Sequence, residues 1–519
     1  MCRSFVPSRG KILAAATPPV NSFYCAKAAA VSRLTRVELT NRLALPTQMV
    51  TSPYSTIAEL AAGIRTKKIF PSEIVDTHFR RIAAVQPKLN AFVHLDKDTA
   101  RAEARAAGDA VLRGDPLGPL HGILLTVKSC IDVAGWPCPA GSMLRKDYVP
   151  SSDAPLVRRL KAAGAILLGN TNTPEFLMAY ETNNLLSGKT SNPWNLEYSA
   201  GGSSGGEAAA IASGCSVAGV GSDGGGSIRV PAHFSGICGL KPTPGRVPAT
   251  GHFPVSAGPF ALLGVVGPMA RTAQDLKVLF EVMQGPDDGD PSAAPVSLRW
   301  PEEQDLKRIR VGYFEDDGRT PVTPETRAAV RAAAEALQYA GFQVEPFRPE
   351  GLEPVRQLWW KLFGIAGGML LGPMTRGHDA ELSPILKEYS AWVASEPAHS
   401  GESLLDTWLQ RDLVRMQIFA QMREYPVLLC PVAAIPAFRH GERRWQIDGK
   451  TVQYLDAWSY TEWFNLLGTP AAVVPVGSSS EGLPIGVQIA ARPWEEELVL
   501  AVAAGLENQM GGWRQPPEL

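Results

Sequence analysis

Two glycine-serine segments, GGSSGGEAAA at 201–210 and GSDGGGSIRVP at 221–231, decide how this sequence is interpreted. A glycine-serine segment on its own is typical of a flexible linker. The apolar, alanine-rich run at 207–213 would not follow a linker that ends in solvent. In the second segment a strand-like run, three glycines, Ser227 and a helical pattern follow one another. That order exposes a hydroxyl at the mouth of a sheet, so we interpret both segments as parts of one site.

The glycines around Ser227 suit a site for acyl transfer. Backbone N–H groups of a glycine-rich turn converge beside the start of a helix, where they bind negative charge. Glycine also lets a reacting carbonyl approach the backbone closely. Donors fixed where charge develops are what an oxyanion hole requires. We therefore expect Ser227 to be a nucleophile beside such a hole.

A serine nucleophile needs a base, and Lys128 in the apolar run ILLTVKS at 123–129 is the candidate. The chain has no G-x-S-x-G motif, and no His has an evident Asp partner. Burial that lowers the pKa of a lysine by about 3 would leave its amine substantially neutral near pH 7. Ser203 would then pass the proton from Ser227 to Lys128. The alternatives are a Lys128 that reaches solvent at its strand end and a Cys130 thiol as nucleophile.

At these residues the chain resembles the amidase signature family, in stretches from about residue 56 to 506 that include NTPEF, NPWN, GPMART and GLPIGVQI. The resemblance implies a Ser-cisSer-Lys triad formed by Ser227, Ser203 and Lys128, with a cis peptide bond at the first serine of the pair. It also implies further roles: oxyanion-hole N–H groups at Gly224, Gly225, Gly226 and Ser227, and supporting polar residues at Ser204, Asp223 and Arg229.

Two positions depart from the family pattern. Ser129-Cys130 stands where the family often has Asp-Asn after the lysine. Gly224 stands where an aliphatic residue is common, and we expect the missing side chain to widen the acyl side of the pocket. Neither change affects the triad, but both bear on substrate specificity.

Short apolar runs alternate with helical patterns along most of the chain, which predicts an α/β protein. Strands are expected at 90–95, 123–129, 165–170, 216–223, 308–314, 342–347, 471–476 and 485–491, and helices at 56–64, 72–85, 97–112 and 325–340. We expect one large domain over 51–519, with a mixed, mainly buried central sheet flanked by helices. Within it, 301–464 would cover the site. Seven of the twelve tryptophans lie in 350–464 (359, 360, 392, 408, 445, 458 and 463) and suggest an apolar or aromatic substrate channel.

Composition excludes several classes of function. The net charge of −1 offers no field for nucleic acid, and no run of about 18 strongly apolar residues predicts a membrane span. Seven cysteines without a C-x-x-C pair favour a reducing, cytoplasmic compartment, with neither a disulfide framework nor a zinc site. Scattered histidines predict a mechanism without metal or cofactor. Residues 1–50, with seven Lys/Arg and one acid, would be a leader, a disordered arm or sequence ahead of a true start at Met49.

The expected function is hydrolysis of a small-molecule carboxamide, with esters, aryl amides or carbamates as close relatives of the substrate. The enzyme would be a monomer or homodimer. The alternative is the amidase-like subunit of a glutamine-dependent tRNA amidotransferase, which would need partner subunits and charged residues to hold glutamine. A non-catalytic scaffold with the same fold is the third possibility.

Overall fold

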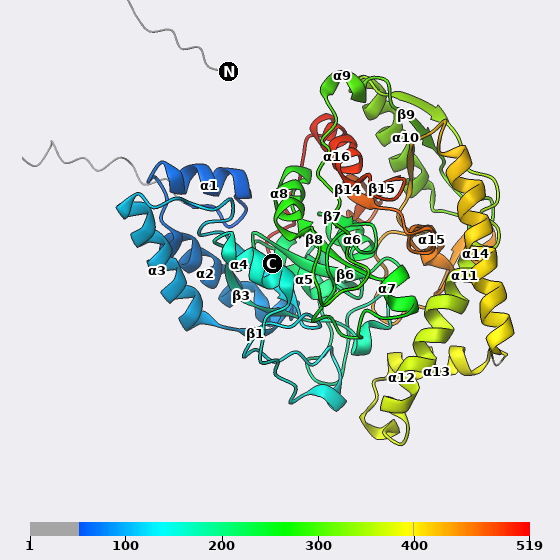
Figure 1. Cartoon of the computed structure of the whole chain (residues 1–519), viewed down its shortest axis with the longest axis horizontal. Coiled ribbons are helices and arrows are strands. Elements are labelled where there is room, and N and C mark those ends of the chain that lie inside the picture. The colour runs from blue at the N-terminus through cyan, green and yellow to red at the C-terminus, as the bar shows by residue number, and fades with distance from the viewer. Residues whose placement is uncertain (1–50, 398) are drawn as a thin grey trace, which may run out of the picture. The chain divides into compact units, whose positions relative to one another are not determined.

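In a computed structural model of the chain, which describes residues 51–397 and 399–519, eleven strands form one mixed sheet (Figure 1). The predictions made for residues 1–50 lie outside the described residues. The strand order is β1-β3-β2-β6-β8-β7-β14-β15-β11-β9-β10. Strands β3, β2 and β6 run parallel, as do β11, β9 and β10, and the pairs between them are antiparallel. The strands of this sheet are β1 (Phe92–Leu95), β2 (Leu124–Lys128), β3 (Ile166–Thr171), β6 (Ala218–Asp223), β7 (Cys238–Lys241), β8 (Val265–Ala270), β9 (Arg310–Tyr313), β10 (Gln343–Pro346), β11 (Val427–Pro431), β14 (Ala471–Ser478) and β15 (Pro484–Ala491).

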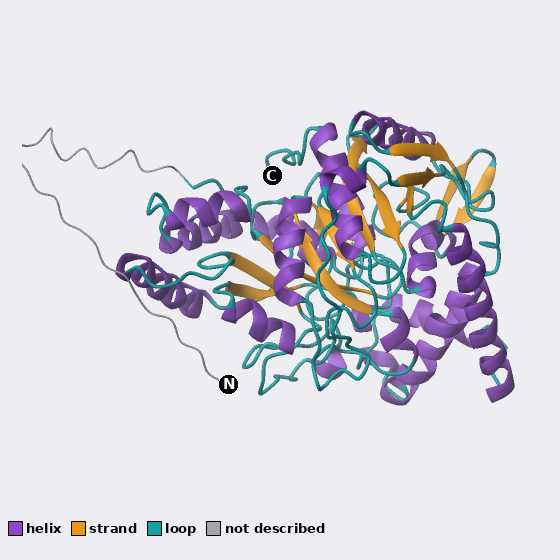
Figure 2. Ribbon diagram, turned by 45° about the horizontal axis from the view of Figure 1, so that its top comes forward, coloured by secondary structure: helices purple, strands orange, loops and turns teal. Residues whose placement is uncertain are grey.

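Helices surround this sheet (Figure 2), which confirms the predicted α/β class. In Figure 1 helices α1 to α3 lie beside β1 and β3, and helices α11 to α14 lie at the opposite end of the molecule. The helices are α1 (Ile57–Arg65), α2 (Pro71–Leu89), α3 (Lys97–Arg113), α4 (Pro155–Ala162), α5 (Gly205–Ala212), α6 (Arg229–Ser235), α7 (Pro259–Leu263), α8 (Ala273–Met283), α9 (Glu303–Leu306), α10 (Pro324–Tyr339), α11 (Val355–Trp359), α12 (Ala366–Thr375), α13 (Pro384–Ala394), α14 (Gly401–Gln421), α15 (Ser459–Leu467) and α16 (Glu496–Met510), and a π-helical turn η4 (Trp360–Ile365) joins α11 to α12. Two small two-stranded sheets complete the fold: β4 (Ser191–Asn192) with β5 (Asn195–Ser199), and β12 (Arg444–Ile447) with β13 (Lys450–Gln453).

Local sequence explains why these elements form where they do. Strands β2, β3 and β6 are buried at every residue, as expected for continuous apolar runs covered on both faces. Helix α1 starts at a capping box in which Thr56 accepts from the Glu59 N–H and the Glu59 side chain accepts from the Thr56 N–H. Within the described part of the chain, every helix is too short or too polar to cross a membrane.

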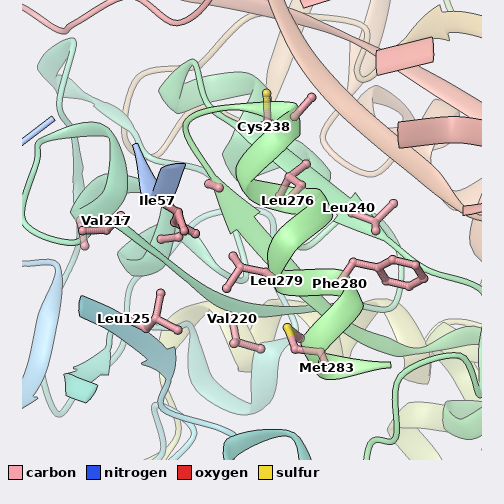
Figure 3. Close-up of a cluster of buried hydrophobic side chains, with 14 of the residues drawn as sticks. Ile57, Leu125, Val217, Val220, Cys238, Leu240, Leu276, Leu279, Phe280 and Met283 are labelled. Carbon is pink, nitrogen blue, oxygen red and sulfur yellow. The ribbon is translucent and has the colours of Figure 1, made fainter. Parts of the chain in front are cut away.

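The core is formed where helices pack their apolar stripe on the strands. Helix α8 presents Leu276, Leu279, Phe280 and Met283, at a spacing of three and four residues, to a cluster that includes Val220 of β6 (Figure 3). All these side chains are fully buried. Full burial of one leucine side chain stabilises the fold by roughly 2 kcal/mol. This packing fixes β6, and with it the segment that carries Ser227.

The region 301–464 contributes to the molecule in two ways. Strands β9, β10 and β11, with α10, extend the central sheet at one end. The segment from α11 to α13 instead reaches the glycine-serine segments. That the whole of 301–464 covers a substrate remains a prediction.

Candidate active site

The two predicted catalytic segments meet at one edge of the sheet. Strands β2 and β6 are parallel neighbours, so their carboxyl ends lie together. Strand β2 ends at Lys128 and β6 at Asp223, directly before the glycines that lead to Ser227. This edge of a parallel sheet is the usual position of a ligand site in α/β proteins.

The first segment is a buried loop rather than a linker. Residues 201–206 are all buried, and α5 starts at Gly205. The Gly202–Ser203 peptide bond is cis, as the resemblance implied. Gly201 has a φ of +83°, and a Cβ there would lie 2.8 Å from the Cα of Pro231. Thr173 Oγ1 donates to the Ser203 carbonyl at 2.7 Å, which fixes the loop at the serine itself.

Lys128 is fully buried and does not reach solvent. Its Nζ donates to Ser203 Oγ at 2.6 Å and to Ser222 Oγ at 3.1 Å. Burial lowers the pKa of Lys128 from 10.5 to about 8. A substantial fraction of the amine is therefore neutral at mildly alkaline pH, and a neutral amine can accept a proton from the hydroxyl beside it.

The second segment holds its carbonyl groups and leaves three N–H groups free. Among the described residues, no hydrogen bond involves the N–H of Gly224, Gly225 or Ser227. The Gly226 N–H donates to Asp223 Oδ1 at 2.8 Å. The prediction of an oxyanion hole that includes the Gly226 N–H is thus corrected: this N–H is engaged by a carboxylate. The carbonyl partners are Asn465 Nδ2 for Asp223 (3.2 Å), Trp359 Nε1 for Gly224 (2.8 Å), Thr461 Oγ1 for Gly225 (2.7 Å) and the Val230 N–H for Gly226 (2.7 Å).

Asp223 and Arg229 form a fully buried ion pair, with Arg229 Nη2 2.9 Å from Asp223 Oδ1. Burial alone would raise the pKa of Asp223, but the guanidinium holds it below its usual value. The ionised carboxylate also accepts from the Ile228 N–H at 3.1 Å. Arg229 in turn donates to Gln488 of β15 at 3.0 Å. The pair ties the loop around Ser227 to the sheet, which fits the supporting role predicted for it.

A cavity opens beside the serines, which we call the serine cavity. Ser203, Ser222 and Ser227 line it together with Gly224, and it holds about 500 Å³ of empty space including its open mouth. Its other walls are mostly apolar, among them Leu177, Met178, Pro254, Phe260, Val265 and Phe363. No hydrogen bond joins the Ser203 and Ser227 hydroxyls in this part of the described chain, although both face the same space. Ser204, predicted as a supporting residue, donates its backbone N–H to the Ser227 carbonyl at 3.1 Å.

A second cavity, of about 460 Å³, begins at Ser227 and runs toward α11 and α13. We call it the aromatic cavity, because its walls are Tyr180, Trp359, Trp360, Phe363, Tyr389, Trp392 and Tyr454. The remaining tryptophans of 350–464 (408, 445, 458 and 463) pack in or against the second hydrophobic core. The expected widening at Gly224 is wrong, since a Cβ there would lie 2.1 Å from Phe363 Cζ. The ring of Phe363 occupies the space that the missing side chain leaves.

Two polar residues near Lys128 were missed in the sequence. Ser222 accepts the second hydrogen bond of Lys128, and its position next to Asp223 was the available signal. Glu207 is fully buried and accepts from the hydroxyls of Thr126 and Thr171, the latter at 2.7 Å. Burial raises the pKa of Glu207 to about 7. Only its place at the end of GGSSGGE, against the strand of the lysine, could have indicated it.

The Cys130 thiol is poorly suited to be a nucleophile. It is fully buried, and burial raises its pKa, which disfavours the reactive thiolate. The five described cysteines, at 130, 138, 215, 238 and 430, are all buried and unpaired. Among residues 51–397 and 399–519, no three His, Cys, Asp or Glu side chains form a group that could hold a metal ion.

Comparisons with known proteins agree with this fold and site. A family model described as Amidase matches residues 73–500. An indoleacetamide hydrolase of Bradyrhizobium diazoefficiens is 36% identical over 466 residues, covering 87% of this chain and 86% of that protein. An amidotransferase subunit of a Synechococcus strain, named for glutamyl-tRNA(Gln), is 33% identical over 501 residues, covering 89% and 98%. The solved structure of a bacterial aryl acylamidase superposes with a TM-score of 0.79 at 28% identity, covering 88% and 97%.

These findings define the class of the protein as an enzyme, a hydrolase of amide C–N bonds. The chain belongs to the amidase signature family.

Proposed function

We propose that this enzyme hydrolyses carboxamides that carry an apolar or aromatic group, through an acyl-enzyme on Ser227. The observation that carries the proposal is the fully buried Lys128 amine, 2.6 Å from a Ser203 hydroxyl that shares a cavity with Ser227. The free N–H groups of Gly224, Gly225 and Ser227 supply the oxyanion hole. Asp223, Arg229 and Ser204 support this loop.

In the first half-reaction Ser227 Oγ forms a bond to the amide carbon. Its proton moves to Ser203, whose own proton moves to the neutral amine of Lys128. The hydrogen bond between Ser203 and Ser227 forms in the substrate complex, since catalytic hydrogen bonds often tighten only there. The C–N bond then breaks, and the proton returns by the same path to the leaving amine. Water attacks the ester, releases the carboxylic acid and restores the Ser227 hydroxyl.

The lining of the two cavities favours an uncharged substrate. Asp223 is the one carboxylate among their described lining residues, and it is paired with Arg229. Burial lowers the pKa of His252 to about 4, so this histidine is neutral. A glutamine substrate would need unpaired charged partners for its ammonium and carboxylate groups. The apolar walls, and the names of the indoleacetamide and aryl acylamide relatives, support an aryl substrate over the tRNA amidotransferase alternative.

A panel of amides tests the proposal. Indoleacetamide, anilides, fatty amides, acetamide and glutamine would be incubated with the full chain, and released amine or ammonia measured. We expect the highest kcat/KM for amides with an aryl group. Glutamine as the best substrate, or copurification with two partner subunits, would favour the tRNA amidotransferase alternative instead.

Replacing Ser203 by alanine should lower kcat by about 10³-fold, because the proton path from Ser227 to Lys128 is broken. KM should change little, since Ser203 contributes no apolar wall to either cavity. Steady-state kinetics on the best amide of the panel would measure both constants. A Ser203→Ala variant with near-normal kcat would show that the bridging role is wrong.

The rate should rise with pH through the pKa of Lys128. The base acts as the neutral amine, and its neutral fraction grows as pH rises past about 8. At pH 7 about a tenth of the molecules hold the neutral form. A kcat/KM profile measured from pH 6 to 10 should therefore climb and then level off above pH 8 to 9. A profile flat from pH 6 to 9 would argue against a lysine base.

A further inference from the structure

The aromatic cavity and the oxyanion loop share one side chain. Trp359, at the end of α11, lines the cavity with its ring and donates its indole N–H to the Gly224 carbonyl at 2.8 Å. It is 5% exposed and stacks on Phe363 at a centroid distance of 5.4 Å. The contact is close because the loop has no side chains: a Cβ on Gly225 would lie 2.4 Å from the Trp359 ring.

The hydrogen bond from Trp359 fixes the direction of a free N–H group. The Gly224 carbonyl and the Gly225 N–H belong to one peptide unit, which is trans. In a trans unit the two groups point in opposite directions. The indole therefore holds the Gly225 N–H pointing away from itself, and this N–H has no hydrogen-bond partner among the described residues.

The other peptide units with a free N–H are held differently. The Asp223 carbonyl, on the unit of the Gly224 N–H, is held by Asn465 within the buried polar network of the ion pair. The Gly226 carbonyl, on the unit of the Ser227 N–H, is held by the backbone of α6. Neither Asn465 nor Val230 lines the serine cavity or the aromatic cavity. Trp359 is thus the holder that substrate can touch.

We propose that Trp359 is a positioning residue that couples the aromatic cavity to the oxyanion hole. Its indole N–H aligns the Gly225 N–H with the oxyanion, and an aryl group in the cavity restrains the ring that makes this contact. An aryl substrate then raises kcat as well as lowering KM. The π-helical turn that follows Trp359 suits this role, because such turns are frequent at functional sites. This inference rests on the proposed function and extends it to the residue that links substrate class to rate.

The test is Trp359→Phe, which keeps an aromatic wall and removes the N–H. We expect kcat to fall about 10- to 100-fold, since a misaligned donor forfeits part of the factor that a lost oxyanion donor costs. The fall should occur with both acetamide and an aryl amide, and the advantage in kcat of the aryl amide should shrink. The rate of labelling by a fluorophosphonate should fall in parallel, because this reaction also develops an oxyanion.

The matched control is Trp194→Phe, which removes an indole hydrogen bond of 2.9 Å to the Ser235 carbonyl, away from both cavities. It reports the cost of losing such a bond to folding alone, and its kcat should stay within about threefold of the wild type. Trp360→Phe changes the cavity wall beside Trp359, and its KM for aryl amides should shift more than its kcat. Equal kcat values for Trp359→Phe and Trp194→Phe, in an otherwise active enzyme, would overturn the inference. Failure of the wild type to cleave any amide of the panel would instead count against the proposed function.

Discussion

Replacing Ser227 by alanine should abolish amide hydrolysis, with a loss in kcat of about 10⁴-fold or more. Ser227 is the one hydroxyl that borders both cavities, and it follows three glycines whose free N–H groups lie in the same loop. Without its oxygen no acyl-enzyme forms, and the remaining groups can only bind the substrate. The measurement is single-turnover kinetics, in which the wild type should show a burst of released amine that the variant lacks.

Labelling by a fluorophosphonate identifies the nucleophile independently of the substrate. Wild-type enzyme should gain one phosphonyl group on Ser227, and Ser227→Ala should gain none. Cys130→Ala should still be labelled, because its thiol is buried against Ser222 and is not the attacking group. Residual turnover of Ser227→Ala close to the wild-type rate would exclude the acyl-enzyme, and labelling at Cys130 would reassign it.

Much of the fold follows from local patterns. Strands β2, β3 and β6 are continuous apolar runs because helices cover both faces, and α10 starts at Pro324 behind Thr323 as its sequence predicts. Strand β8 was not predicted, since Gly267 and Pro268 interrupt its apolar run. The strand order could not be predicted either. Strand β8 lies between β6 and β7 through antiparallel pairs that no local spacing records.

The site divides in the same way. Lys128 and the two glycine-serine segments were predictable, because residues at the ends of neighbouring parallel strands are brought together by the sheet itself. The groups that hold the glycine loop were not. Trp359, Thr461 and Asn465 come from segments more than 130 residues further along the chain. Tertiary packing alone places them, so local motifs identify the reacting groups and miss those that orient them.

Replacing Lys128 by alanine should lower kcat by about 10⁴-fold, nearly as much as the loss of the nucleophile. The variant loses the acceptor for the Ser227 proton and also the hydrogen bonds to Ser203 and Ser222. The pH profile separates these effects, because the rise near pH 8 should disappear together with the rate. A variant whose lower activity still rises through pH 8 would place the base elsewhere.

Lys241 supplies the matched control, since burial lowers its pKa to about 7, below that of Lys128. A ranking by pKa alone would choose Lys241 as the base. Geometry chooses Lys128, because the amine of Lys241 donates to the Pro242 carbonyl at 2.9 Å and to no serine. Lys241→Met should therefore keep the rise in rate near pH 8, whereas Lys128→Ala removes it. If Lys241→Met removed that rise while Lys128→Ala kept it, the proton from Ser227 would have to reach the other lysine.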